Sequence, residues 1–169
     1  MESLGIEMAR SEVAYSVDQA LEIADKLGYP VVLRPAYTMG GEGGGLVYNV
    51  EELKTVCARG LQASMVGQVL VEESILGWEE LELEVVRDSK NNMITVCFIE
   101  NIDPVGVHTG DSFCSAPMLT ISEEVQKRLQ EKSYKIVEAI QVIGGTNVQW
   151  AHDPKTDRDI VIEINLVPP

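Results

Sequence analysis

The last two strand-like runs of the sequence predict a β-hairpin, and its register constrains the fold more than any other feature. The runs Asn147–His152 and Ile160–Asn165 alternate polar with apolar residues over most of their length and flank a turn-rich stretch centred on Thr156. In a hairpin symmetric about Thr156, residues equally far from the centre face each other across the two strands. Directly opposed residues project from the same face of a sheet, so this symmetry assigns each side chain to a face.

This register separates a polar face from an apolar face. Gln149 lies opposite Glu163, and Asn147 lies opposite Asn165, so four polar side chains share one face. The residues expected on the other, core-facing side are Val148, Trp150, Ile160, Ile162 and Ile164. A carboxylate with nearby amide oxygens is a suitable set of ligands for Mg²⁺ or Mn²⁺. The hairpin therefore predicts a metal site, although a hairpin with one solvated face has the same pattern.

Three helices are predicted from their ends. Each begins at a residue whose side chain caps a helix, followed by acidic or amide residues in the first turn. These starts are Ser16 with Gln19, Asn49 with Glu52, and Ser122 with Glu123 and Glu124. The apolar residues that follow at helical spacing are Ala20, Leu21, Ala24 and Leu27 in the first helix, Leu53, Val56, Cys57 and Leu61 in the second, and Val125, Leu129, Ile136 and Ile140 in the third. Gly28, with Pro30 beyond it, ends the first helix.

Four further strand-like runs do not alternate regularly with the helices. They are Val31–Arg34, Val69–Glu72, Glu80–Val86 and Met93–Glu100. This mixed order predicts an α+β fold with antiparallel pieces rather than a regular βα repeat. We place a boundary after Gln68, which gives a smaller lobe over residues 1–68 and a larger lobe over residues 69–169.

The chain is strongly acidic, which limits its partners. Its 169 residues carry 13 basic and 27 acidic side chains, a formal net charge of −14. Such a surface repels nucleic acids and anionic membranes, so neither is expected as a partner. The three cysteines are widely spaced, which disfavours a disulfide framework or a zinc site and fits a reducing cytoplasm. The sequence lacks the pattern of a signal peptide and any apolar run long enough to span a membrane.

The segment from Arg34 to Gly45 predicts a phosphate-binding loop. It follows a short apolar strand and holds five glycines within six positions. Glycine lets main-chain N–H groups approach phosphate oxygens closely, and Arg34 at the end of the strand adds a permanent cation beside them. No Gly-Lys-Ser/Thr motif follows, so the segment is not a P-loop. A hairpin tip without a ligand is the alternative.

Two other groups of polar residues are candidates for a site. His108 lies in a short polar segment between Gly106 and Gly110, where it has the chemistry to hydrogen-bond a phosphate or a small anion, although a lone histidine is more often structural. Strand alternation puts Glu80, Glu82 and Glu84 on one face. Charges in such a row are commonly just solvated.

Taken in order, seven segments resemble the carbamoyl-phosphate synthase large-subunit family over almost the whole chain. They are RPAYTMGG (34–41), ESILGWEE (73–80), EVVRD (84–88), IENID (99–103), GVHTGDS (106–112), NVQ (147–149) and IEIN (162–165). The resemblance implies an α+β ATP-grasp fold, in which two small lobes hold a nucleotide site between them. The glycines after residue 39 and the Gly-Trp pair at 77–78 are similar to the amino-terminal half of that subunit. That half uses ATP to phosphorylate bicarbonate, and the carboxyphosphate then reacts with ammonia to give carbamate.

The resemblance also implies a role for each candidate residue. Arg34, Gly40 and Gly41 would contact phosphates, Glu73 and Ile75 would line the adenine pocket, Glu80 would hold the ribose, Gly106, Val107 and His108 would lie along the nucleotide and anion channel, and Gln149, Glu163 and Asn165 would hold Mg²⁺ or Mn²⁺. The last three are the residues that the hairpin register selects independently. Arg34 and His108 are the candidate catalytic residues, since catalysis of phosphoryl transfer is mostly positioning and charge neutralisation. The implied partners are ATP, bicarbonate, ammonia and, in the parent enzyme, a glutaminase small subunit.

The sequence departs from the family's pattern at both ends. The family has a further domain before this region, which contributes an arginine, and it continues with Pro-Arg where this chain has Leu166 after Asn165. We therefore expect the isolated chain to bind nucleotide with little or no turnover. The alternatives are another ATP-grasp ligase, such as a biotin-carboxylase-like enzyme, and a non-catalytic nucleotide-binding module.

Overall fold

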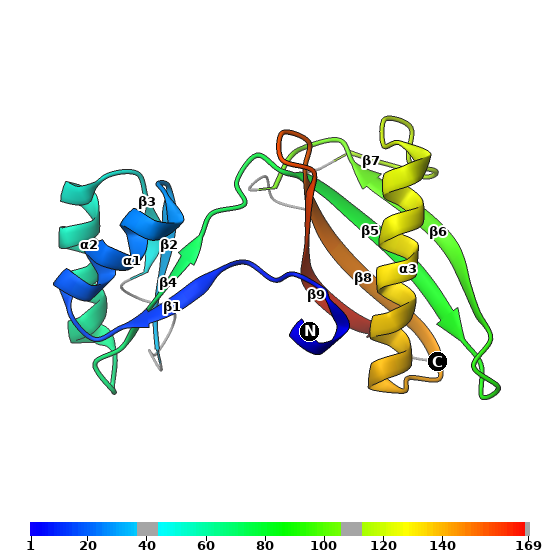
Figure 1. Ribbon diagram of the computed structural model, residues 1–169, viewed down its shortest axis with the longest axis horizontal. Coiled ribbons are helices and arrows are strands. Elements are labelled where there is room, and N and C mark those ends of the chain that lie inside the picture. The colour runs from blue at the N-terminus through cyan, green and yellow to red at the C-terminus, as the bar shows by residue number, and fades with distance from the viewer. Residues whose placement is uncertain (37–43, 106–112, 168–169) are drawn as a thin grey trace. The chain divides into compact units, whose positions relative to one another are not determined.

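The computed structural model describes residues 1–36, 44–105 and 113–167, and the chain divides into two compact units (Figure 1). The small unit is Ala9–Ser74, and the large unit combines Met1–Met8 with Ile75–Pro169. The small unit contains β1 (Ser11–Ala14), α1 (Val17–Leu27), β2 (Val31–Pro35), β3 (Gly45–Val47), α2 (Val50–Ala63) and β4 (Val69–Glu73). The large unit contains the 3₁₀-helix η1 (Glu2–Leu4), β5 (Glu79–Arg87), β6 (Met93–Asn101), β7 (Cys114–Ser115), α3 (Glu123–Ile140), β8 (Gly144–Asp153) and β9 (Arg158–Val167).

The small unit is a four-stranded antiparallel sheet covered on one face by two helices. Its strand order is β1-β4-β2-β3, and α1 and α2 pack against the same side (Figure 1). The core between them consists of Ala14, Ala20, Ile23, Ala24, Val31, Leu33, Val47, Leu53, Cys57, Val69 and Val71. On the other face of the sheet lie Arg34 of β2, which is exposed, and Glu72 of β4, which is partly exposed.

The helices begin where their caps predict. Ser16 Oγ accepts a hydrogen bond from the Gln19 N–H at 3.2 Å, and Asn49 Oδ1 accepts one from the Glu52 N–H at 2.9 Å. Each satisfies a main-chain donor that the first helical turn leaves without a partner. Gly28 ends α1 with a φ of 82°, a backbone conformation that glycine adopts without strain.

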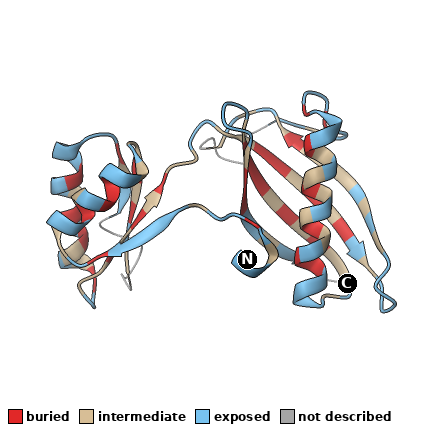
Figure 2. Cartoon of the chain, viewed as in Figure 1, coloured by how far each residue is buried: buried red, intermediate tan, exposed pale blue. Residues whose placement is uncertain are grey.

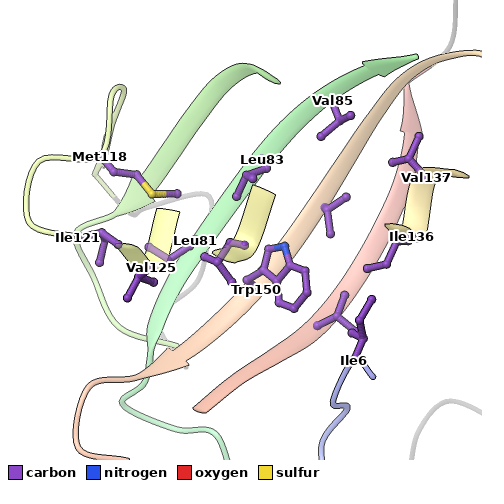
Figure 3. Close-up of a cluster of buried hydrophobic side chains, with 13 residues drawn as sticks. Ile6, Leu81, Leu83, Val85, Met118, Ile121, Val125, Ile136, Val137 and Trp150 are labelled. Atoms are coloured by element: carbon purple, nitrogen blue, oxygen red, sulfur yellow. The ribbon is translucent and has the colours of Figure 1, made fainter. Parts of the chain in front are cut away.

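The large unit is a five-stranded antiparallel sheet crossed on one face by α3. Its order is β7-β6-β5-β8-β9 (Figure 1). Trp150 lies at the centre of the core between sheet and helix (Figure 3), with no exposed surface. Its Nε1–H donates to Ser133 Oγ of α3 at 3.0 Å. The N-terminal segment joins this unit because Ile6 packs into the same core and Glu7 bridges to Ile160 of β9. In Figure 2 the buried residues of α3 accordingly lie along the side that faces the sheet.

All six predicted strands are present, and the structure adds β1, β3 and β7. The added strands have two to four residues each, too few for a periodic pattern to distinguish them from loops. β4 pairs with β1 and β2 and therefore belongs to the small unit, whereas the boundary placed after Gln68 assigns it to the larger lobe.

One residue of the predicted helix faces lies outside the core. Ile140, the last residue of α3, is 43% exposed and does not belong to the core, although it is at helical spacing from the buried Ile136. The helix ends there, and the next residue, Gln141, has a left-handed conformation with a φ of 55°. The predicted helical spacing therefore continues to the end of α3, but its last apolar residue is exposed.

A charged network attaches α3 to the β8–β9 hairpin at one end of the core. Asp159 is 3% exposed and accepts hydrogen bonds from Arg128 Nε at 2.5 Å and Lys132 Nζ at 3.1 Å. Its other oxygen lies 2.8 Å from His152 Nδ1, and Arg128 also reaches Asp157. Burial raises the pKa of Asp159, but the hydrogen bonds from Arg128, His152 and Lys132 outweigh burial and bring the pKa below its usual value.

We expect Asp159→Asn to lower the free energy of unfolding by about 2 kcal/mol at pH 7, because the substitution removes the charge that two cations share. A carboxyl whose folded-state pKa is lowered stabilises the fold above its unfolded pKa of about 4, and this contribution is lost as the pH falls through the folded-state value. Urea unfolding at pH 7 and at about pH 3 should therefore show a large difference between the two proteins at pH 7 and a smaller one in acid.

Asp25→Asn provides the matched control, since Asp25 is exposed on α1. We expect it to change the free energy of unfolding by less than about 0.5 kcal/mol. A difference between wild type and Asp159→Asn that grows on acidification would contradict the assigned sign.

Candidate functional site

The polar side chains of the large unit form two adjacent rows across three strands, on the sheet face opposite α3. In the first row, Glu82 of β5 lies opposite Gln149 of β8, which lies opposite Glu163 of β9. In the second row, Glu84, Asn147 and Asn165 are paired in the same way. The predicted pairs Gln149–Glu163 and Asn147–Asn165 are thus confirmed. Six polar residues, rather than the four of the hairpin alone, share this face.

A β-bulge in β9 produces this register. Near the turn, Trp150 pairs with Val161, but the next pair is Gln149 with Glu163, so Ile162 is an extra residue on β9. Without the extra residue, Gln149 would face Ile162, and Glu163 would move to the opposite face. The bulge therefore sets the carboxylate of Glu163 beside the amide of Gln149.

The bulge also corrects the predicted core. Ile162 was expected in the core but is 40% exposed, because it occupies the extra position. Val161 takes its place and is 5% exposed within the core around Trp150. Strict alternation along the strand fails here, since a bulge adds one residue to one strand only.

Asn147 connects the carboxylates of the two rows. Its Nδ2–H₂ donates to Glu84 Oε1 at 2.6 Å and to Glu82 Oε2 at 3.0 Å. Asn101 of β6 donates a further hydrogen bond to Glu82 Oε1 at 3.2 Å. Asn147 Oδ1 is buried and accepts no hydrogen bond from any residue that the structure describes. The rows therefore contain a buried oxygen acceptor that a bound cation or its water would satisfy.

The donor set fits a divalent metal ion that arrives with phosphate oxygens. Glu163 and Asn165 are exposed and Gln149 is half-buried, so one carboxylate and two amide oxygens are accessible on this face. Such oxygen ligands suit Mg²⁺ or Mn²⁺, and Mg²⁺ commonly takes only one or two carboxylates, with phosphate and water completing its shell. Within the described part of the chain, no group of three or more His, Cys, Asp or Glu side chains is placed to hold a metal by itself.

Glu80 lies next to the first row, two residues before Glu82 on the same face of β5. It is 8% exposed and pairs with Ala151 of β8 and Asn101 of β6. Burial, and then the neighbouring charge of Glu82, raise the pKa of Glu80. Together with Glu82 and Glu84, it makes β5 a strand with three carboxylates on one face, as alternation predicts.

In the small unit, Arg34 lies where the sequence places it, at the end of β2. Its side chain is 67% exposed and its Nε lies 3.1 Å from Glu72 Oε2, on the sheet face without helices. Gly44 directly precedes β3 at the end of the glycine-rich segment, and a Cβ atom at this residue would lie 2.6 Å from the Leu33 carbonyl oxygen. That approach requires glycine, so at least this glycine serves packing of the loop base.

Glu73 and Ile75 have different surroundings. Glu73 ends β4, is 7% exposed and is hydrogen-bonded to Arg10. Ile75 is half-buried and begins a turn whose Trp78 N–H donates to the Ile75 carbonyl at 3.1 Å. The same turn exchanges hydrogen bonds with Val105, from the Gly77 N–H at 3.1 Å and to the Trp78 carbonyl at 2.9 Å. The turn that starts at Ile75 thus lies beside the segment leading to residue 106.

The remaining candidates lie outside the described residues. These are Gly40, Gly41, Gly106, Val107 and His108. Sequence reasoning missed polar residues that contact or neighbour the candidates: it treated Glu82 and Glu84 as ordinary solvated charges, and it did not single out Asn101 or Arg10. The register of β5 against β8 was the available signal for the two glutamates, because it places them opposite Gln149 and Asn147.

Solved structures identify the class of fold. Biotin carboxylase from Campylobacter jejuni, as a β,γ-ATP complex, covers 97% of this chain and 37% of its own chain with a TM-score of 0.73 and 23% identity. An ADP complex of N5-carboxyaminoimidazole ribonucleotide synthetase covers 99% of this chain and 42% of its own, with a TM-score of 0.71 and 18% identity. At these identities the likeness shows the fold alone, which is the α+β ATP-grasp fold that the sequence predicts.

Sequence comparison identifies the family. A family model described as "Carbamoyl-phosphate synthase L chain, ATP binding domain" matches residues 1–166. Carbamoyl phosphate synthase large chains from Xylella fastidiosa (strain Temecula1) and Archaeoglobus fulgidus are 51% and 49% identical over 166 residues, which are 98% of this chain and 15% of each relative. The chain belongs to this family of ATP-binding domains. It spans 15% of the length of these relatives. No helix in the described ranges is long and apolar enough to cross a membrane.

The bulge predicts that threonine substitutions at two neighbouring positions lower the free energy of unfolding by different amounts. Val161→Thr buries a hydroxyl in the core and should lower the free energy of unfolding by about 1–3 kcal/mol. Ile162→Thr places its hydroxyl at an exposed position and should cost less than about 1 kcal/mol. Urea unfolding of the two variants measures the difference. Equal costs, or the reverse order, would show that β9 has no bulge at Ile162.

Proposed function

We propose that this chain is the ATP-binding part of a carbamoyl-phosphate synthase large chain and takes part in the ATP-dependent phosphorylation of bicarbonate. The observation that carries the proposal is the pair of polar rows, where Gln149, Glu163 and Asn165 come together from two strands. Family membership supports ATP as the ligand. The structure of a related fold, the biotin carboxylase domain of Hydrogenobacter thermophilus 2-oxoglutarate carboxylase, is described as a complex with MgADP, ADP and bicarbonate.

Each candidate residue then has a proposed role. Arg34, Gly40 and Gly41 contact the phosphates, Glu73 and Ile75 line the adenine, Glu80 holds the ribose, Gly106, Val107 and His108 lie along the nucleotide and bicarbonate, and Gln149, Glu163 and Asn165 hold Mg²⁺ or Mn²⁺. The metal ion supplies charge neutralisation on the phosphate oxygens. We assign the reaction to the amino-terminal half of the large chain.

The proposed phosphoryl transfer needs positioning and charge neutralisation from the protein rather than covalent catalysis. Arg34 neutralises charge on the γ-phosphoryl group, and His108 positions the acceptor anion, while a bicarbonate oxygen attacks phosphorus and ADP leaves. The product is carboxyphosphate, which reacts with ammonia to give carbamate and phosphate. In the longer protein, a glutaminase small subunit would supply the ammonia.

The Cys57, Cys97 and Cys114 thiols are all free, which supports a cytoplasmic location.

The alternatives differ in their support. The biotin carboxylase and the N5-carboxyaminoimidazole ribonucleotide synthetase compared above share the fold at 23% and 18% identity, whereas carbamoyl phosphate synthase large chains share about half of the residues. This difference favours carbamoyl phosphate synthesis. A chain that spans 15% of its relatives is expected to bind ATP with little or no turnover by itself.

Calorimetric titration with MgATP tests the proposal. We expect wild-type binding that depends on Mg²⁺ and that Glu163→Ala weakens by about tenfold, or about 1.4 kcal/mol, because the metal loses its only carboxylate ligand among the three proposed. Glu131→Ala, an exposed glutamate on α3, is the matched control and should bind like wild type. ADP release with and without bicarbonate then measures any turnover.

Two outcomes would count against the proposal. A folded wild-type chain that binds no nucleotide contradicts it directly. Equal affinity of wild type and Glu163→Ala would contradict the metal assignment while leaving ATP binding intact.

A further inference from the structure

Glu73 is a buried carboxylate that forms an ion pair with Arg10, at the other end of the small unit's sequence. Arg10 Nε and Nη2 donate to Glu73 Oε2 at 3.1 and 3.0 Å, and the Arg10 main-chain N–H donates to Oε1 at 2.8 Å. In return, the Glu73 main-chain N–H donates to the Arg10 carbonyl at 2.8 Å. Four hydrogen bonds thus join one residue to the other, and we call this set the Arg10–Glu73 clamp.

The clamp lies at the end of a central strand. β4 is hydrogen-bonded to β1 on one side, where Ser11 pairs with Glu72, and to β2 on the other, where Val31 pairs with Glu73. Arg10 directly precedes β1, so the clamp extends the β1–β4 ladder by one residue and closes it with a side chain. The position of Glu73 is therefore fixed from both neighbouring strands.

The chemistry of the pair favours a fixed geometry. Burying a carboxylate that is only 7% exposed is costly without a charged partner, and the rigid, planar guanidinium directs two donors to one of its oxygens. The Arg10 side chain is itself 59% exposed, so the clamp is open to solvent on the arginine side only. Both Glu73 oxygens accept from Arg10, so the pair holds the end of β4 in place.

We infer that Arg10 is a positioning residue for the purine base of the bound nucleotide. This inference rests on the proposed function, which places Glu73 and Ile75 along the adenine. Arg10 does not contact the nucleotide: it fixes the strand end from which the base-binding segment 73–75 continues. Loss of the clamp lowers the fraction of chains in which this segment is ready to bind, and the apparent affinity falls by the same factor.

The test compares a ligand that contains a purine base with one that has only the phosphate chain. MgATP and magnesium tripolyphosphate are titrated by calorimetry into wild type, Arg10→Ala, Arg10→Lys and Arg59→Ala. Arg59 is an exposed arginine on α2 of the same unit and controls for the loss of one positive charge. We expect Arg10→Ala to weaken MgATP binding about tenfold and to leave tripolyphosphate binding within about twofold of wild type. Arg59→Ala should change neither.

Arg10→Lys retains the charge but cannot form the fork, so it should weaken MgATP binding by an intermediate factor of about three. It also keeps the test decisive if Arg10→Ala does not fold. In a double-mutant cycle, Glu73→Gln should cost clearly less in the Arg10→Lys background than in wild type, because the two residues act through one clamp.

The outcomes separate this inference from the proposed function. A wild-type chain that binds neither ligand overturns both. A wild-type chain that binds MgATP, with Arg10 variants that lose ATP and tripolyphosphate affinity equally or lose neither, overturns only the role of Arg10.

Discussion

The antiparallel pairing of β8 with β5 and β9 decides where the core and the polar rows of the large unit lie. Alternate residues of β8 point to opposite faces, so Val148 and Trp150 enter the core under α3 while Asn147 and Gln149 face away from it. The same strand thus carries the centre of the core and the centre of the site. A shift of one residue in its register would expose Trp150 and bury Gln149, so packing energy fixes the site geometry.

Two features keep this arrangement in place near the hairpin turn. The bulge at Ile162 corrects the register between the turn and the polar rows, and the network around Asp159 anchors the turn side of the hairpin to α3. Within this network the Asp159 side chain is buried, whereas the Asp157 side chain is exposed to solvent. With the bulge at this position, Val161 and Ile164 both pack into the core while Glu163 and Asn165 lie on the polar face.

Sequence reasoning predicted what depends on local pattern and missed what depends on distant partners. Caps, helix periods and the pairing of Gln149 with Glu163 follow from residues close in sequence, and the structure confirms them. Ile162 could not be placed, because a bulge is chosen by packing against β8 and the core. The Arg10–Glu73 clamp joins residues 63 positions apart, and only the β1–β4 pairing brings them together. The lobe boundary depends on the same pairing, which draws β4 into the small unit.

The negative charge on the polar face favours the cation that we propose for it. Glu80, Glu82 and Glu84 lie about 7 Å apart along β5, where two carboxylates repel by roughly 2 kcal/mol at an effective dielectric constant of 20. The amides of Asn101 and Asn147 donate hydrogen bonds to Glu82 and Glu84 but carry no charge, so the face remains negative. A polyphosphate approaching Glu163 without a cation adds to that repulsion. A divalent ion held by Glu163 would offset this negative charge, so we expect a polyphosphate to bind the face only together with a metal ion.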